Sequence, residues 1–154
     1  MNRFALGALG AAFALPALRR ESRDHLERAE RALATVGLDG VALATAGSLP
    51  FGQQKLVEVA RALASEPALL LLDEPAAGLN TSEKAEMMGL IGRLPALGIS
   101  ILIIEHDMRL VMGVSDRVVV LNYGEKIAEG TPAEVQRDPG VIKVYLGEDV
   151  AAVA

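Results

Sequence analysis

Ionisable side chains follow two short apolar runs of the sequence, at the point where each run ends. Asp73 and Glu74 come directly after four consecutive leucines, and His106 comes after the apolar run 99–104 and one further acid. Carboxylates and imidazoles transfer protons and bind metal ions, so these residue types could do chemistry. A structural alternative is that the two acids are merely solvated in a tight turn before Pro75. They could also stabilise the N-terminus of a following helix through its dipole.

The two apolar runs have the length and composition of strands that are buried on both faces. They comprise residues 68–72 and 99–104 and are separated by a segment with helical spacing. Two strands joined by a helix are expected to be parallel, with a right-handed crossover. Ligands bind beyond the carboxyl ends of such strands, so Glu74 and His106 should converge there if the strands are neighbours.

The rest of the sequence predicts an α/β fold, with helical material first and a mostly parallel sheet flanked by helices after it. Helices are expected from Ser22 to Val36 and from just after Gly52 to Ser65, with core positions at Leu26, Ala29, Leu33, Val36, Leu56, Val59, Ala60 and Leu63. A third helix should begin at Asn80, with Glu83 as its reciprocal capping partner and a buried stripe at Met87, Leu90, Ile91 and Leu94. The remaining expected elements are a short helix at 109–114, a strand at 117–121, a hairpin turn at Tyr123-Gly124, a strand at 126–129 and a capped helix from Thr131.

The apolar stretch from Phe4 to Leu18 has two interpretations. It follows Arg3 and has small residues near 14–17, as a secretory signal does, but it is too short to span a bilayer as a helix. The other interpretation is a helical segment of the domain, with Pro16 and the following arginines in a loop before the next helix.

Composition narrows the classes of function. Twenty acidic residues outnumber fifteen basic ones, and the net charge of −5 argues against a nucleic-acid partner. The absence of tryptophan, with three phenylalanines and two tyrosines, argues against base stacking. The sequence has no cysteine, which excludes disulfides and thiolate chemistry, and two histidines leave little for a histidine-based metal site.

The four leucines followed by Asp73 and Glu74 resemble the hydrophobic-strand carboxylate motif of P-loop nucleotide hydrolases. In that motif the first carboxylate can hold Mg²⁺ through its water shell. The second can orient and polarise the water that attacks a γ-phosphate.

Further motifs stand around this one in a fixed order. Leu49-Pro50-Phe51-Gly52-Gln53 precedes a helix and the leucine strand, and Ala77-Gly78-Leu79-Asn80 and the strand that leads to His106 follow. This order resembles the ATP-binding-cassette (ABC) ATPases, in which signature, Walker B strand, D-loop and switch histidine succeed one another. The closer likeness is to the ATP-binding subunits of branched-chain amino-acid importers, through residues 75–80, 105–108 and 145–148. The resemblance covers residues 1 to about 148.

The resemblance implies a role for each matched residue. Asp73 would be the magnesium-side carboxylate, acting through water, Glu74 the catalytic base, and His106 the switch residue at the γ-phosphate. The signature would act on ATP held by the opposite subunit, through the backbone of Gly52 and the N-terminus of the following helix, and it comprises Leu49, Pro50, Phe51, Gly52 and Gln53. Asn80 would belong to the D-loop at the dimer interface.

The sequence also departs from the family pattern. Pro50 stands where most members have a serine, and Asn80 replaces the usual aspartate. A phosphate-cradling loop would read Gly, four residues, Gly-Lys-Ser/Thr, and none is present, because Gln53 and Gln54 stand where Lys and Ser/Thr are required. The family's glutamine loop and adenine-stacking aromatic are likewise not found before residue 49.

These departures lead us to expect the C-terminal portion of a cassette ATPase, inactive alone. Residues 1–66 would be a helical subdomain portion that ends in the signature and its helix. Residues 67–154 would be the C-terminal part of the ATPase core.

The resemblance further implies ATP and Mg²⁺ as cofactors and a peripheral location on the cytoplasmic face of the plasma membrane. The implied partners are a second ATP-binding subunit in a homo- or heterodimer, membrane permease subunits and, indirectly, a periplasmic solute-binding protein. Two other function classes stay open. One is a non-catalytic interaction module that supplies a signature face to a partner cassette, and the other is an exported α/β protein with a cleaved N-terminal signal.

Overall fold

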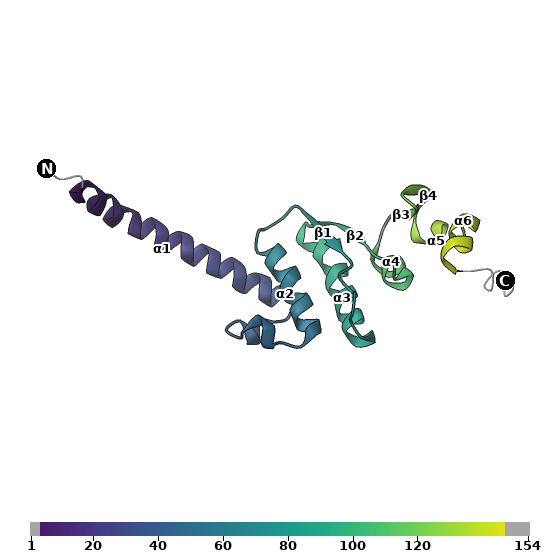
Figure 1. The fold of residues 1–154 in the computed structure, drawn as a ribbon, viewed down its shortest axis with the longest axis horizontal. Helices are drawn as coiled ribbons and strands as arrows, with labels where there is room; N and C mark the ends of the chain where they lie inside the picture. The colour runs from purple at the N-terminus through teal and green to yellow at the C-terminus, as the bar shows by residue number, and fades with distance from the viewer. Residues whose placement is uncertain (1–3, 147–154) are drawn as a thin grey trace. The chain divides into compact units, whose positions relative to one another are not determined.

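The computed structural model describes the backbone of residues 4–146 and the side chains of residues 20–145. The chain divides into two compact units whose boundary lies between Leu70 and Leu71, inside strand β1. Figure 1 colours the elements along the chain. Those of the first unit are α1 (Phe4–Thr35), the 3₁₀ turns η1 (Asp39–Val41) and η2 (Ala46–Ser48), and α2 (Phe51–Leu63).

The elements of the second unit begin with β1 (Leu69–Asp73). In chain order, those that follow are α3 (Thr81–Arg93), the 3₁₀ turn η3 (Leu94–Leu97), β2 (Ser100–Ile104), α4 (Met108–Val114), β3 (Val118–Asn122), β4 (Glu125–Gly130), α5 (Pro132–Val135), α6 (Pro139–Val141) and the π-helical turn η4 (Ile142–Leu146).

Helix α1 is continuous from Phe4 to Thr35, so the loop predicted around Pro16 is wrong. The helix continues through this proline although it lacks a backbone donor and its ring crowds the preceding turn. The neighbouring alanines and leucines favour helix strongly and offset part of that cost. Within the described residues, no helix combines the length and the apolar character needed to cross a membrane.

The core of the first unit lies where the end of α1 meets α2. Its buried residues include Ala32, Val36, Val59, Ala60 and Leu63. Leu26 is exposed, contrary to prediction, because full burial on α1 begins only at Ala32 among the described side chains. Arg31 reaches Glu66 beyond the end of α2, with 3.1 Å between Nη2 and Oε1. Helix α2 begins at Phe51, two residues before the predicted start, because Pro50 already takes the extended conformation of an N-cap.

Strands β1 and β2 pair in a parallel two-stranded sheet, as predicted. Leu70 and Leu72 are buried, whereas Leu69, Leu71 and, on β2, Leu102 and Ile104 are exposed. The prediction that both faces of these strands are buried is therefore wrong. A sheet that is covered on one face leaves every second side chain in solvent.

Helix α3 confirms the predicted capping box. The Asn80 side chain accepts from the backbone N–H groups of Ser82 and Glu83, and the Glu83 carboxylate accepts from the Asn80 N–H. The predicted stripe is also confirmed, with its members 0–2% exposed: Met87, Leu90, Ile91 and Leu94. The chain leaves η3 at Gly98, whose φ of 81° places it in the left-handed region that glycine favours.

Strands β3 and β4 form a separate antiparallel hairpin with Val118 opposite Gly130. Its turn residues Tyr123 and Gly124 have φ values of 49° and 83°, as a two-residue hairpin turn of type I′ requires. The predicted turn is confirmed, and so is the capping box of α5 between Thr131 and Glu134. The hairpin packs on α5 and α6 around a small cluster of valines, Val118, Val120, Val135 and Val141.

Candidate functional site

The chain turns sharply at Glu74, directly after β1 ends at Asp73. The Glu74 N–H donates to the carbonyl of Ile104 at 2.9 Å, which is the last link between the two strands. Its φ is 45°, a left-handed conformation that costs on the order of 1 kcal/mol for a residue with a β-carbon. The N–H of Ala77 donates to the Glu74 carbonyl at 3.1 Å and closes the turn. These backbone bonds hold Glu74 in its strained conformation at the strand edge.

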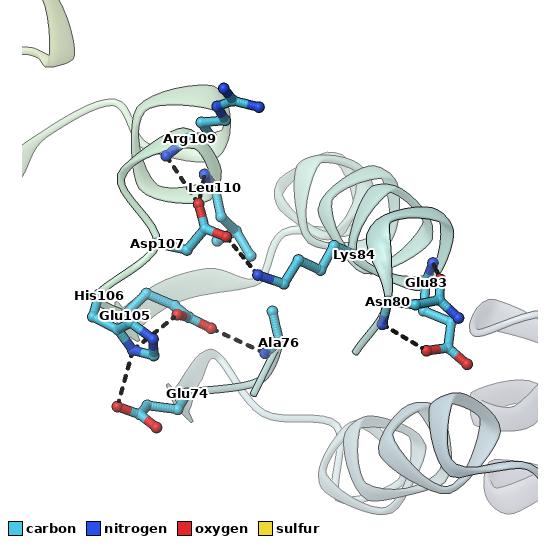
Figure 2. A network of polar contacts seen from close by, with 10 residues as sticks. All are labelled: Glu74, Ala76, Asn80, Glu83, Lys84, Glu105, His106, Asp107, Arg109 and Leu110. Carbon is cyan, nitrogen blue, oxygen red and sulfur yellow. Dashed lines mark hydrogen bonds and ion pairs between the residues drawn. The ribbon is translucent and has the colours of Figure 1, made fainter. Parts of the chain in front are cut away.

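His106 follows β2 at the same edge, and its ring meets the carboxylate of Glu74. Figure 2 shows the two side chains pointing toward each other, with 3.2 Å between His106 Nδ1 and Glu74 Oε1. A carboxylate only accepts, so Nδ1–H is the donor in this contact, and Nε2 remains for another partner. The structure therefore brings together the acid and the imidazole that were expected to converge.

The Glu74–His106 contact is exposed and therefore weak. The His106 side chain is 72% exposed and that of Glu74 is 50% exposed. Ion pairs of this kind contribute at most about 1 kcal/mol, because water screens them and the side chains lose entropy. Both groups can consequently exchange this contact for a phosphate or a water molecule.

Asp73 is the last residue of β1 and is exposed at the same edge. Among the described residues, no three His, Asp or Glu side chains gather in a way that could hold a metal ion. Mg²⁺ commonly keeps several waters and substrate phosphate oxygens and takes only one or two carboxylates. Asp73 fits a magnesium ion bound in that manner, and it does not fit a metal site built from protein ligands alone.

Glu105 was missed by sequence reasoning as a member of the site. Its side chain is 1% exposed, and Oε1 accepts from the N–H of Ala76 at 3.0 Å (Figure 2). Its Oε2 lies 3.9 Å from His106 Nδ1. The available signal was position, because consecutive residues of an extended chain point to opposite sides, so an acid directly before an exposed histidine faces inward.

A second missed contact joins α3 to α4. Lys84 Nζ lies 2.7 Å from Asp107 Oδ2, and Asp107 Oδ1 accepts from the backbone N–H groups of Arg109 and Leu110 (Figure 2). The hydrogen bond from Lys84, followed by that from the Leu110 N–H, lowers the pKa of Asp107 below its ordinary value. Helix α4 begins at Met108, one residue before the predicted start at Arg109, with Asp107 as its N-cap. An aspartate close before a predicted helix was the available signal for this cap, because aspartate is a preferred N-cap residue.

The predicted signature residues lie in the first unit, at the start of α2. Pro50 is the N-cap and provides no side-chain acceptor, so the first N–H groups of α2 have no side-chain cap. Gln54 Nε2 donates to the carbonyl of Leu49 at 2.8 Å. Phe51 is exposed, with the Lys55 ammonium 5.9 Å from its ring centre, and Gly52 is buried. Gln53 is half-buried in the first turn of α2.

Asn80 lies before α3, where its side chain is engaged in the capping box. Of the predicted site residues in the second unit, the structure thus joins Glu74 to His106 directly. Asp73 is beside them in the chain, and Asn80 contacts its own helix.

Comparisons with known proteins show which family the chain resembles. A family model described as ABC transporter matches residues 8–77, and one described as branched-chain amino acid ATP-binding cassette transporter matches residues 125–151, of which 147–151 lie outside the described structure. BraF of Pseudomonas aeruginosa, a high-affinity branched-chain amino acid transport ATP-binding protein, is 45% identical over 141 residues, which are 91% of this chain and 55% of BraF. LivG of Salmonella typhimurium, which has the same description, is 47% identical over 86% of this chain and 52% of its own length.

Relatives with another cargo also match. LptB of Acidithiobacillus ferridurans, a lipopolysaccharide export ATP-binding protein, is 39% identical over 81% of this chain and 52% of LptB. The chain spans about half the length of each of these curated relatives.

Solved cassettes share the fold. The ADP conformation of MJ1267, an ATP-binding cassette of an ABC transporter, superposes with a TM-score of 0.73 at 36% identity, over 80% of this chain and 50% of that one. A nucleotide-free cassette gives a TM-score of 0.72 at 35% identity, over 80% of this chain and 51% of its own. The chain therefore matches ABC-type cassettes in sequence and fold over about half of their length. It belongs to the ABC transporter ATP-binding family, and its C-terminal residues match the branched-chain amino acid type.

Proposed function

We propose that this chain supplies the hydrolytic strand edge and the signature segment of an ATP-binding subunit that powers an importer of branched-chain amino acids. The observation that carries the proposal is the contact of 3.2 Å between Glu74 Oε1 and His106 Nδ1 at the carboxyl edge of two parallel strands. Further support comes from the match of residues 125–151 to the branched-chain family model and from the descriptions of BraF and LivG.

At this edge Glu74 orients and polarises the water that attacks the γ-phosphate of ATP, and His106 contacts that phosphate through its ring. Asp73 would hold Mg²⁺ through the water shell of the ion, which would supply positive charge to offset that of the phosphates. Because the Glu74–His106 contact is weak and exposed, nucleotide can displace it at little cost in free energy.

The signature residues 49–53 act on ATP that is held by a second ATP-binding subunit. The N-terminal N–H groups of α2 carry no side-chain cap, so they are able to donate to phosphate oxygens. Asn80 belongs to the loop that meets this second subunit. Membrane permease subunits on the inner face of the plasma membrane are the further partners, and they receive the solute from a periplasmic binding protein.

We expect this chain not to hydrolyse ATP by itself. Its sequence contains no Gly-x-x-x-x-Gly-Lys-Ser/Thr, and backbone N–H groups with a lysine are needed to neutralise a triphosphate. The purified chain is expected to show no tight Mg-ATP binding and no turnover. Robust hydrolysis by the chain alone would contradict this part of the proposal.

The decisive experiment restores a phosphate loop. The chain is mixed with the segment of Pseudomonas aeruginosa BraF to which it does not align, which we expect to carry the phosphate loop (the phosphate-loop segment), and ATP hydrolysis is measured. Hydrolysis should appear on mixing, and Glu74→Gln should lower its kcat by about 10²-fold or more, since general-base catalysis contributes that much. Hydrolysis that is indifferent to Glu74→Gln would overturn the assigned role.

A second candidate function is a non-catalytic module, favoured by a signature segment without a phosphate loop in the same sequence. Such a module acts through α2 and not through Glu74. Titration of the chain into intact BraF distinguishes the two functions. If the chain is a non-catalytic module, the wild type and the Glu74→Gln variant change the ATPase rate of BraF by the same amount. The effect is lost in Gly52→Val, because Gly52 is buried at the start of α2.

A further inference from the structure

The side chain of Glu105, directly before His106, is buried and contacts the turn that carries Glu74. Its side chain is 1% exposed, whereas those of its two neighbours in the site are half exposed or more. A buried carboxylate is costly unless it is hydrogen-bonded. The partners of its two oxygens therefore indicate what this side chain does.

The first oxygen holds the turn that carries Glu74. Glu105 Oε1 accepts from the N–H of Ala76 at 3.0 Å, and Ala76 is itself buried. Glu74, two residues earlier, has a φ of 45°, and such a conformation persists only when its surroundings hold it. Glu105 thus anchors the strained turn from the neighbouring strand end, across 29 residues of sequence.

The second oxygen faces the ring of His106. Glu105 Oε2 lies 3.9 Å from His106 Nδ1, the same nitrogen that is 3.2 Å from Glu74 Oε1 (Figure 2). The Nδ1–H of His106 therefore has a carboxylate acceptor in Glu74 and a second carboxylate, that of Glu105, slightly farther away. If Glu74 turns toward a water molecule, His106 can still keep a charged acceptor by a small movement of its ring.

We propose that Glu105 is the positioning residue of the Glu74–His106 pair. One of its oxygens fixes the turn that carries Glu74, and the other receives the Nδ1–H of His106 when Glu74 is engaged elsewhere. The effect on hydrolysis rests on the proposed function, whereas the two contacts can be tested in the full chain without nucleotide.

Two substitutions separate the two contacts. Glu105→Gln keeps an amide oxygen that can accept from Ala76 N–H but removes the charge beside His106, whereas Glu105→Ala removes both. Glu125→Gln, which replaces an exposed glutamate of β4, is the matched control. The readouts are amide hydrogen exchange at Ala76 and the ¹⁵N resonances of the imidazoles. The chain has only two histidines, so His25 serves as the internal reference.

In Glu105→Gln the Nδ1 resonance of His106 should move, while that of His25 and the exchange rate of Ala76 stay as in wild type. In Glu105→Ala the exchange of Ala76 should accelerate about tenfold, since a hydrogen bond to a charged group is lost. Glu125→Gln should change neither. An unmoved His106 resonance in Glu105→Gln, or unchanged exchange in Glu105→Ala, overturns the corresponding contact.

Wild-type measurements keep the anchoring testable if Glu105→Ala does not fold. The Ala76 N–H should then exchange at least about tenfold more slowly than that of exposed Gly78 in the same turn, and equal rates overturn the anchor.

A kinetic arm tests the effect on hydrolysis. In the mixture with the phosphate-loop segment, Glu105→Gln should lower kcat about tenfold with little change in the KM for ATP, because it acts on the catalytic pair and not on nucleotide binding. Glu125→Gln should leave both constants unchanged. An unaltered kcat in Glu105→Gln overturns the positioning role. If the wild-type mixture does not hydrolyse ATP, the proposed function fails, and the exchange and resonance measurements still decide the two contacts.

Discussion

Lys84 Nζ lies 2.7 Å from Asp107 Oδ2, and this contact ties the first turns of α3 to the N-cap of α4. Asp107 directly follows His106, so the segment that carries the imidazole is fixed on one side by an ion pair and a helix cap. On its other side Glu105 is bonded to the turn after β1. The imidazole thus stands, itself exposed, between two anchored carboxylates of its own segment.

Removal of the Lys84–Asp107 contact should destabilise the chain in a pH-dependent way. Lys84→Met keeps the unbranched shape and most of the length of the side chain but removes its charge. It should lower the free energy of unfolding by about 0.5–1 kcal/mol at neutral pH, the usual range for a partly exposed pair. The pKa of Asp107 is lowered in the folded chain, mainly by Lys84, so the unfolded chain binds more protons as the pH falls. The contribution is therefore present above the ordinary value of 3.8 and is lost as the pH falls from there through the lower pKa of Asp107 in the folded chain.

Urea unfolding of both chains between neutral pH and the acid range measures this difference. Lys143→Met, on the exposed turn η4, is the control for loss of a positive charge and should show no such dependence. A difference between wild type and Lys84→Met that persists after Asp107 is protonated would show that the lysine acts by packing alone.

The capping box of α3 should depend on an oxygen acceptor at position 80 and not on the amide as such. Asn80→Ala leaves the N–H groups of Ser82 and Glu83 without their acceptor and should cost about 1 kcal/mol in thermal or urea unfolding. Asn80→Asp, which restores the residue usual in the family's D-loop, should stay within about 0.5 kcal/mol of wild type, because a carboxylate accepts equally well at a helix N-terminus. Equal losses in both variants would contradict this account.

Local chemistry explains which parts of the fold were predictable from sequence. The caps at Asn80 and Thr131 and the turn at Tyr123-Gly124 were predicted correctly, because the residues that form each feature lie within four positions of one another. The convergence of Glu74 and His106 followed from the rule that parallel strands end at one edge.

Features that depend on distant segments were not predictable. The leucine run predicts a strand that is buried on both faces. Burial depends on which elements pack against a strand, and Leu71 is exposed in the structure. The bond between Glu105 and the Ala76 N–H spans 29 residues and has no local signature. The continuous helix through Pro16 shows that a strong local signal can be outweighed by its neighbours.

A substitution in the turn between β3 and β4 should stabilise the chain. Tyr123 is fully exposed and has a φ of 49°, which asparagine tolerates better than an aromatic residue. Tyr123→Asn should therefore raise the free energy of unfolding by about 0.5 kcal/mol. Gly124→Ala, at a φ of 83°, should lower it by about 1 kcal/mol. Differential scanning calorimetry checks both signs, and a stabilising Gly124→Ala would contradict the assigned turn.

The same substitution should have very different effects on stability at two adjacent leucines of β1. Leu71 is 65% exposed, whereas Leu72 is 8% exposed. Leu71→Thr places a β-branched residue, which suits a strand, on the exposed face. It should change the free energy of unfolding by no more than about 0.5 kcal/mol while it reduces binding of the apolar dye ANS. Leu72→Thr removes core volume and buries a hydroxyl, which should cost about 2–5 kcal/mol. Urea unfolding and dye fluorescence measure both effects. Equal destabilisation by the two variants would mean that the face of Leu71 is covered in solution. Only truncation of a side chain that is shielded from water lowers the free energy of unfolding by that much.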